Sequence, residues 1–231
     1  MKTLKIFAAL FILGIASTVV LAQEKTEVRN LTGFTAIDVS AGIAVELTYG
    51  DKEFVEVTTD IDFIDQVITE VNDDELNIYI KSNNWNSWNK KVLVKVTITK
   101  VNSIKSSSGA SIVSQNLIES EDLKMNTSSG ASLKIAFKAP NAKCEASSGA
   151  TAKLKGVAKQ FYADASSGSS IHANDVKAIK ANVSASSGAS ISINAEEEIK
   201  ADASSGGSIK YSGSPKMVDI EKSSGGSVRK E

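Results

Sequence analysis

The sequence predicts an all-β protein built as a parallel β-solenoid, in which short strands stack along a common axis. Three observations support this prediction. A Ser-Ser-Gly string recurs every 18 to 21 residues, apolar and polar residues alternate on both sides of it, and no amphipathic helical pattern of useful length follows residue 22. We expect rungs of about 19–20 residues, capped at one end by strands from the N-terminal part of the chain.

Residues 1–22 have the order of a secretory signal peptide. Two lysines within residues 1–5 precede an apolar run over residues 6–22, and Val20-Leu21-Ala22 would precede a cut at Gln23. The alternative is a membrane anchor, but a run of about 17 residues is at the lower limit for spanning a bilayer. No cysteine lies directly after the apolar run, and this disfavours attachment to a membrane through a lipid on such a cysteine. We expect a secreted, periplasmic or cell-surface protein without a membrane span after cleavage.

The net charge limits the class of partner, and the cysteine content limits how the fold can be stabilised. The chain has 26 basic and 27 acidic residues, and removing the two lysines of the signal peptide leaves a net charge of 24 − 27 = −3. This balance argues against a nucleic-acid or membrane-surface partner. Cys144 is the single cysteine, so the chain has no internal disulfide and must be stabilised by packing and backbone pairing.

Residues 23–101 form the expected N-terminal β region, which we predict to be strands joined by turns. The alternation has a period of two and is rich in β-branched residues, as in half-buried strands. The predicted strands span residues 36–40, 43–47, 54–58, 66–71, 75–80 and 91–98, with a short helical turn at 62–65.

Residues 102–231 form the expected repeat region. The seven repeat glycines are Gly109, Gly130, Gly149, Gly168, Gly188, Gly206 and Gly225. In every copy the residues five before and three after the glycine are apolar, and the residue four before it is polar. Each repeat therefore predicts two short strands, each with one face toward a shared core, on either side of a corner at Ser-Ser-Gly.

The Ser-Ser-Gly string has three possible interpretations. A flexible linker would lack the flanking apolar columns. A serine nucleophile would need a histidine base, and the chain has only His172, which we expect to be an exposed strand residue. We favour an architectural corner, because glycine can adopt a positive φ there and stacked serines can hydrogen-bond to corner backbone groups.

The segment Phe34–Gly50, FTAIDVSAGIAVELTYG, and the rungs that follow resemble a family of secreted bacterial proteins, "putative auto-transporter adhesin, head GIN domain" (DUF2807). The resemblance extends over roughly residues 34–214. It departs from the family at Ala44, where Asn or Asp often follows the glycine and aliphatic residue. The resemblance implies a right-handed β-helix-like fold and a secreted or surface location. It implies no catalytic or ligand residues.

The segment Lys81–Lys91, KSNNWNSWNKK, is the most unusual stretch outside the repeats. Its tryptophans, Trp85 and Trp88, lie among four asparagines in an expected hairpin loop. Exposed aromatic rings beside amides are suited to contact with a sugar or a protein, so both tryptophans are candidate ligand-binding residues. The alternative is that one or both rings pack back onto the sheet.

Glu145, Asp164, Asp202 and Glu221 share one outward column in the predicted rungs. Neighbouring carboxylates could serve glycoside hydrolysis or bind Ca²⁺. Lysines two residues earlier instead favour a solvated, charge-balanced face, and the calcium-binding Gly-Gly-x-Gly-x-Asp repeat is absent. We therefore predict no catalytic residue, no metal site and no cofactor. Cys144 is expected to be a buried, inert thiol.

The sequence thus predicts a non-enzymatic binding module of the cell envelope or exterior, with a glycan or surface protein as partner. A polysaccharide-active β-helix enzyme and an ice-binding solenoid are the alternatives. Steps of 18 to 21 residues leave no room within rungs for the loop insertions that usually build an active-site groove, which disfavours the enzyme. The sequence leaves the oligomeric state open.

Overall fold

The computed structural model describes residues 23–81 and 90–231, so the expected signal peptide lies outside the described residues. In this described part, all regular elements are β-strands except the 3-10 helix η1 (Ile64–Gln66), which overlaps the predicted helical turn. The strands join into a single 18-stranded network that winds around one core. The all-β prediction is therefore confirmed.

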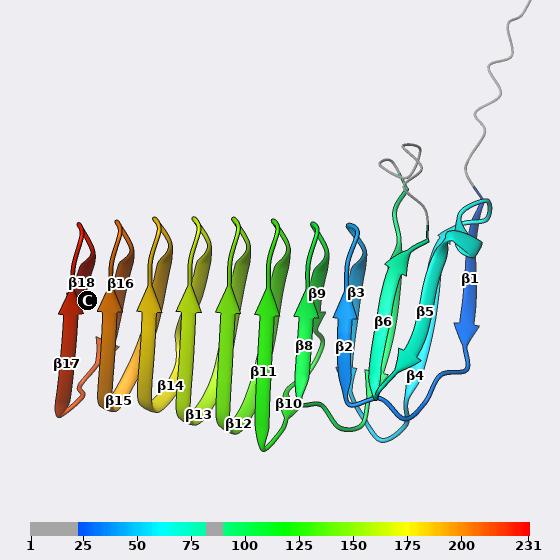
Figure 1. The fold of residues 1–231 in the computed structure, drawn as a ribbon. Helices are drawn as coiled ribbons and strands as arrows, with labels where there is room; N and C mark the ends of the chain where they lie inside the picture. Colours follow the sequence, from blue (N-terminus) through cyan, green and yellow to red (C-terminus); the bar gives the residue numbers. More distant parts are fainter. Residues whose placement is uncertain (1–22, 82–89) are drawn as a thin grey trace, which may run out of the picture.

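The strands form two facing layers (Figure 1). We call the layer nearer the viewer in Figure 1 the front sheet. It contains β2 (Ala36–Val39), β8 (Ser103–Ser106), β11 (Asp122–Thr127), the second halves of β12 (Ser132–Ala146), β13 (Thr151–Ala165), β14 (Ser170–Ala185) and β15 (Ser190–Ala203), and β17 (Met217–Lys222). The back sheet contains β3 (Ala44–Tyr49), β9 (Ser111–Ser114), the first halves of β12–β15, β16 (Ser208–Gly213) and β18 (Ser227–Lys230). The two-residue strand β10 (Ile118–Glu119) pairs with β12.

Neighbouring rungs pair in parallel, with each strand in register with its counterpart one rung away. The chain runs up the front strands, crosses at the top and returns behind them while it advances from right to left (Figure 1). The coil is therefore a right-handed β-solenoid, as the family resemblance implies.

The Ser-Ser-Gly strings form the turns between the two sheets, and Ser147–Ala150 illustrates their geometry. Ser148 and Gly149 have φ angles of 52° and 72°, and the Ala150 N–H donates to the Ser147 carbonyl at 3.1 Å. Positive φ at both central residues defines a type I′ turn. The sequence predicted positive φ at the glycine; the preceding serine adopts it as well.

Successive turns are also bonded to one another. The Gly149 N–H donates to the carbonyl of Ser167 in the next turn at 3.1 Å, and the other repeats do the same. Ala41 and Gly42 have φ angles of 61° and 72°, and Gly42 bonds to Ser108 at 3.0 Å. The strand pair β2–β3 is thus one more rung with the same corner. The parallel ladder therefore continues through the turns without a gap.

The second corner of each rung differs from our expectation of two separate short strands. The strands β12–β15 run for 14 to 16 residues and bend from the back sheet into the front sheet without a break. A register shift between Lys153 and Lys155 of β13, opposite His172 and Asp175 of β14, absorbs the extra residue of the 20-residue step. A larger irregularity between Ala173 and Lys177 interrupts the pairing of β14 with β15 at the bend.

The core lies between the two sheets and is built from the two predicted apolar columns. All seven residues three after the glycine are buried, from Ile112 to Val228. In the column five residues before the glycine, only Ile220, in the last rung, is partly exposed. Cys144 is fully buried, and this burial raises the pKa of its thiol to about 12. The prediction of a buried thiol is confirmed.

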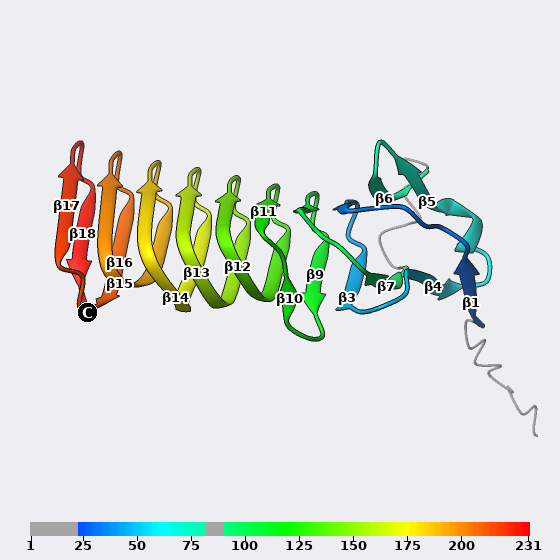
Figure 2. The ribbon, with the colours of Figure 1, turned by 90° about the horizontal axis from the view of Figure 1, so that it is seen from below.

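The N-terminal end of the stack is closed by antiparallel strands. β6 (Glu75–Ile80) and β7 (Leu93–Ile98) pair in parallel with β2 and β3. Beyond them, β5 (Val67–Asn72) pairs antiparallel with β6, β4 (Phe54–Asp60) with β7, and β1 (Glu24–Arg29) with β4. Figure 2 shows these strands at the end opposite β17 and β18. Residues 36–49 form a rung that stacks directly on residues 103–114. The solenoid therefore contains residues from both sides of position 101–102, where the expected N-terminal β region meets the expected repeat region.

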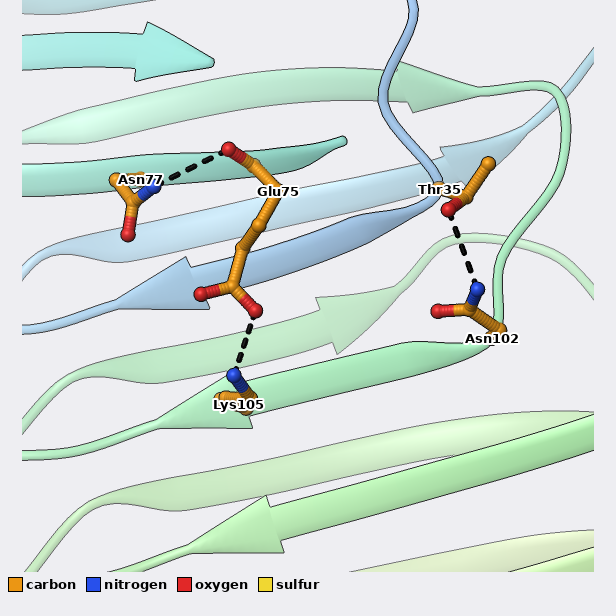
Figure 3. Close-up of polar contacts among 5 residues, drawn as sticks. All are labelled: Thr35, Glu75, Asn77, Asn102 and Lys105. Carbon is orange, nitrogen blue, oxygen red and sulfur yellow. Dashed lines mark hydrogen bonds and ion pairs between the residues drawn. The ribbon is translucent and has the colours of Figure 1, made fainter. Parts of the chain in front are cut away.

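Polar side chains join the cap to the first rungs (Figure 3). Glu75 on β6 and Lys105 on β8 form an ion pair of 2.6 Å that spans the intervening strand β2. The Asn102 amide donates to the Thr35 hydroxyl at 3.2 Å, and its backbone N–H donates to the Thr35 carbonyl at 2.9 Å. These contacts fix the point where the chain re-enters the stack.

Asp38 is partly buried on β2, between Glu75 and Lys105. Desolvation raises the pKa of its carboxyl, and the nearby Glu75 carboxylate adds to the rise, whereas Lys105 opposes it. The folded protein therefore binds a proton at Asp38 more tightly than the unfolded chain does. This contribution to stability is fully present below the unfolded value of 3.8 and is lost as the pH rises through the folded pKa.

We predict that Gly149→Ala lowers the free energy of unfolding by about 1–2 kcal/mol, the cost of a left-handed conformation for a residue with a Cβ. No atom lies within 4 Å of the position that a Cβ would occupy at Gly149, so the effect would be conformational rather than steric. Urea denaturation followed by circular dichroism measures it. Ser148→Asn is the matched control and should be at least as stable as the parent, because asparagine tolerates this conformation. Equal stability of Gly149→Ala and the parent would contradict the turn argument.

We also predict that Asp38→Asn stabilises the protein modestly at pH 7, because the amide has no charge to desolvate. The difference between variant and parent should vanish below pH 3.8, where Asp38 is protonated in both the folded and the unfolded protein. Thermal unfolding across pH 3 to 7 tests this. A variant that is less stable than the parent at pH 7 would show that the attraction between Asp38 and Lys105 outweighs the desolvation.

Candidate binding surfaces

Functional side chains in this fold lie on the outer faces of the two sheets and on the line of turns between them. The turns form a ridge along one edge of the solenoid, at the top in Figure 1. The seven repeat glycines of the predicted corners lie in this ridge, each between a front strand and a back strand. Trp85 and Trp88, the predicted ligand-binding residues, lie outside the described residues, so their role stays a prediction.

The front sheet presents one continuous column of polar residues beside the ridge. In stacking order the column consists of Asp38, Lys105, Asn126, Glu145, Asp164, Ser184, Asp202 and Glu221. The prediction that four of these acids share an outward column is confirmed. Asp38 was not predicted to belong to it. It lies four residues before Gly42, so aligning Ser40-Ala41-Gly42 with the Ser-Ser-Gly strings would have revealed it.

An open furrow of about 520 Å³ runs between this column and the serines of the turns. Within it, Glu145 is held by an ion pair of 2.6 Å with Lys143. The Asn126 amide, oriented to satisfy both of its polar atoms, donates to the other Glu145 oxygen at 2.7 Å. The hydrogen bond and charge of Glu145, with a further contribution from Asp164, raise the pKa of Lys143. Glu145 therefore lies in a polar, charge-balanced network, as predicted for this face.

The back sheet carries a column of hydroxyl groups two residues after each repeat glycine. The column consists of Ser111, Ser132, Thr151, Ser170, Ser190, Ser208 and Ser227. Ser132 donates to Ser111 at 3.1 Å, and Ser170 and Ser190 are 3.0 Å apart. The hydroxyl-bearing residues are half-buried, and these two neighbouring pairs bond along the column.

A second furrow, of about 510 Å³, crosses the back sheet next to the hydroxyl column. Its charged lining consists of Lys134, Lys153, Lys155, His172 and Asp175. Lys134, Lys153 and His172 are register partners on β12, β13 and β14. His172 is an exposed strand residue, as predicted.

The sequence reasoning missed the basic character of this furrow. Lys134 and Lys153 each lie four residues after a repeat glycine and therefore share one column, which was not connected with Lys155. Lys155 lies two residues further along β13 and therefore faces the same side of the sheet. The charge pattern was thus visible in the aligned repeats.

Two kinds of feature are absent from residues 23–81 and 90–231. This part of the chain contains no group of three or more His, Cys, Asp or Glu side chains that could hold a metal ion. It also contains no helix with the length and apolar character that a membrane-spanning helix needs.

Comparison with solved structures shows the same fold in bacterial proteins. A putative adhesin from Bacteroides fragilis is 19% identical, with a TM-score of 0.83 over 90% of this chain and 97% of its own. A putative adhesin from Parabacteroides merdae is 18% identical, with a TM-score of 0.70 over 90% and 96%. A putative lipid binding protein from Parabacteroides distasonis is 19% identical, with a TM-score of 0.69 over 90% and 96%. No curated protein matches the chain.

A family model matches residues 33–215, which include the first rung, the cap strands and most of the solenoid. Its description, putative auto-transporter adhesin, head GIN domain, is the one that the segment Phe34–Gly50 and the repeated corners suggest. The chain belongs to this family.

Proposed function

We propose that this protein is a secreted, non-enzymatic binding module of the bacterial cell envelope, which adheres to a glycan or a surface protein through the outer faces of its solenoid. The observation that carries the proposal is the form of these faces. They are long, regular strips of polar side chains with open furrows. The family description as an adhesin and the signal-peptide pattern of residues 1–22 support the same function.

The regular rungs explain why the faces suit an extended ligand. Neighbouring rungs repeat the same side-chain position about every 4.8 Å along the axis. The two described furrows, of about 520 and 510 Å³, each cross several rungs. A chain-like ligand that follows the axis meets equivalent groups on successive rungs. Many weak contacts can then add up to stable attachment.

Hydrolysis of a polysaccharide is the second candidate, because Glu145 and Asp164 are neighbours on adjacent rungs. Retaining glycosidases hold two carboxyl groups about 5–5.5 Å apart. Glu145 already accepts hydrogen bonds from Lys143 and Asn126, which favours a structural role for this carboxylate. We therefore rank binding above hydrolysis.

We predict that the purified protein, starting at Gln23, binds at least one ligand on an array of immobilised glycans and extracellular matrix proteins. It should leave the bound glycan uncleaved when the products are analysed by chromatography. A Glu145→Gln/Asp164→Asn variant should still bind, because the proposed attachment adds up many weak contacts over successive rungs. Absence of binding to every ligand would refute the adhesive function. Cleavage that the double variant abolishes would establish the enzyme instead.

A further inference from the structure

We infer that the furrow on the back sheet, across β12, β13 and β14, is a binding site for an acidic polysaccharide. This inference deepens the proposed function and rests on it, since it names the ligand class and the face that binds it. The site consists of Lys134, Lys153, Lys155 and His172, together with polar groups of Ser114 and Asn174.

The three lysines are placed side by side rather than spread over the surface. Lys134 and Lys153 are register partners on adjacent strands, and parallel neighbours lie about 4.8 Å apart. Lys155 faces the same side of β13. Like charges opposite one another on neighbouring strands destabilise a sheet. Lys155 has Asp175 as its register partner on β14, but the Lys134–Lys153 pair brings the fold no such compensation. A role in binding an anion is the physical reason that we assign to this pair.

The ion pairs of the solenoid show that this cluster differs from the lysines of the front face. There, Lys105 pairs with Glu75 at 2.6 Å, Lys143 with Glu145 at 2.6 Å, and Lys180 with Glu198 at 3.2 Å. None of the three furrow lysines has an ion-pair partner within 4.0 Å in the described part of the chain. Asp175 is the one acid in the lining, so with His172 neutral the furrow carries a formal charge of +3 − 1 = +2.

The uncharged groups of the furrow fit a sugar. Asn174 presents an amide, and Ser192 on the next rung donates to its oxygen, which leaves the amide N–H groups available to a ligand. The Ser114 hydroxyl accepts the Ala136 N–H at 2.8 Å and keeps its own proton to donate. Hydroxyl, amide and ammonium groups together match the hydroxyl and acidic groups of an acidic sugar.

The direction of the site favours a polymer over a single small anion. Lys134, Lys153 and His172 follow one another along the solenoid axis, and the hydroxyl column runs parallel to them. A polysaccharide lying along the axis would meet a lysine on the β12 and β13 rungs and the imidazole of His172 on the β14 rung. Nucleic acid fits less well. Single strands bind by stacking their bases on aromatic side chains, and the described lining contains no Phe, Tyr or Trp.

We predict that the protein binds immobilised polygalacturonate or dextran sulfate and binds neutral dextran at least about tenfold more weakly. Polygalacturonate carries carboxylates and dextran sulfate carries sulfates, so comparing the two affinities shows which acidic group the site prefers. Biolayer interferometry of the triple variant Lys134→Gln/Lys153→Gln/Lys155→Gln should show affinity reduced about tenfold or more. Raising the salt from about 0.1 to about 1 M should weaken parent binding, because the Debye length falls from about 10 to 3 Å.

The matched control is Lys124→Gln/Lys200→Gln/Lys222→Gln, which removes three exposed lysines from the front sheet outside the front furrow and changes the net charge equally. Its affinity should stay within about twofold of the parent. The Lys134→Arg/Lys153→Arg/Lys155→Arg variant should retain binding, and thermal unfolding of each variant checks that it folds. Equal loss in both glutamine variants would overturn the site in favour of general charge attraction. Binding only to neutral glycans or proteins would overturn the ligand class but keep the proposed function, and binding to nothing would refute both.

Discussion

The rest of the structure depends on one constraint, namely that neighbouring rungs must share backbone hydrogen bonds along most of their length and also at the Ser-Ser-Gly corners. An ordinary loop would interrupt the ladder there and leave buried N–H and C=O groups without partners. The paired positive φ angles of Ser148 and Gly149 turn the chain while keeping the glycine N–H aimed at the next rung. The corner thus sets the rung length, the register and the stacking at once.

Register in turn determines the chemistry of the surface. Since equivalent residues are stacked along the axis, a residue type that recurs in the repeat becomes a column. Alanine, isoleucine and cysteine form the narrow core, and serine forms the hydroxyl column. Where the repeat diverges, as at Lys134, Lys153 and Lys155, a local site arises on an otherwise uniform face. Function in this fold therefore lies in the differences between copies.

Much of this architecture was predictable from the sequence, because alternation with a period of two and a repeated glycine report directly on strands and corners. The positive φ of Ser148 was not predictable from propensity, since only the stacked ladder forces a serine into that conformation. The continuous bend of β12 was also missed, because alanines and a proline near residue 140 resemble a break in a strand. The ion pair of Glu75 with Lys105 depends on β2 lying between β6 and β8, a long-range pairing that no local pattern encodes.

The same inserted cap has a consequence for how the chain acquires its structure. Most rungs contact a neighbour about 19 residues away, so their pairing closes short loops. The rung of residues 36–49 instead meets residues 103–114, which follow 67 residues later. Its pairing therefore carries a larger entropy cost and must wait until that partner has left the ribosome or the export channel. The first rung in the sequence therefore closes only after the cap strands and residues 103–114 have been made, and until then its apolar residues stay exposed to other chains.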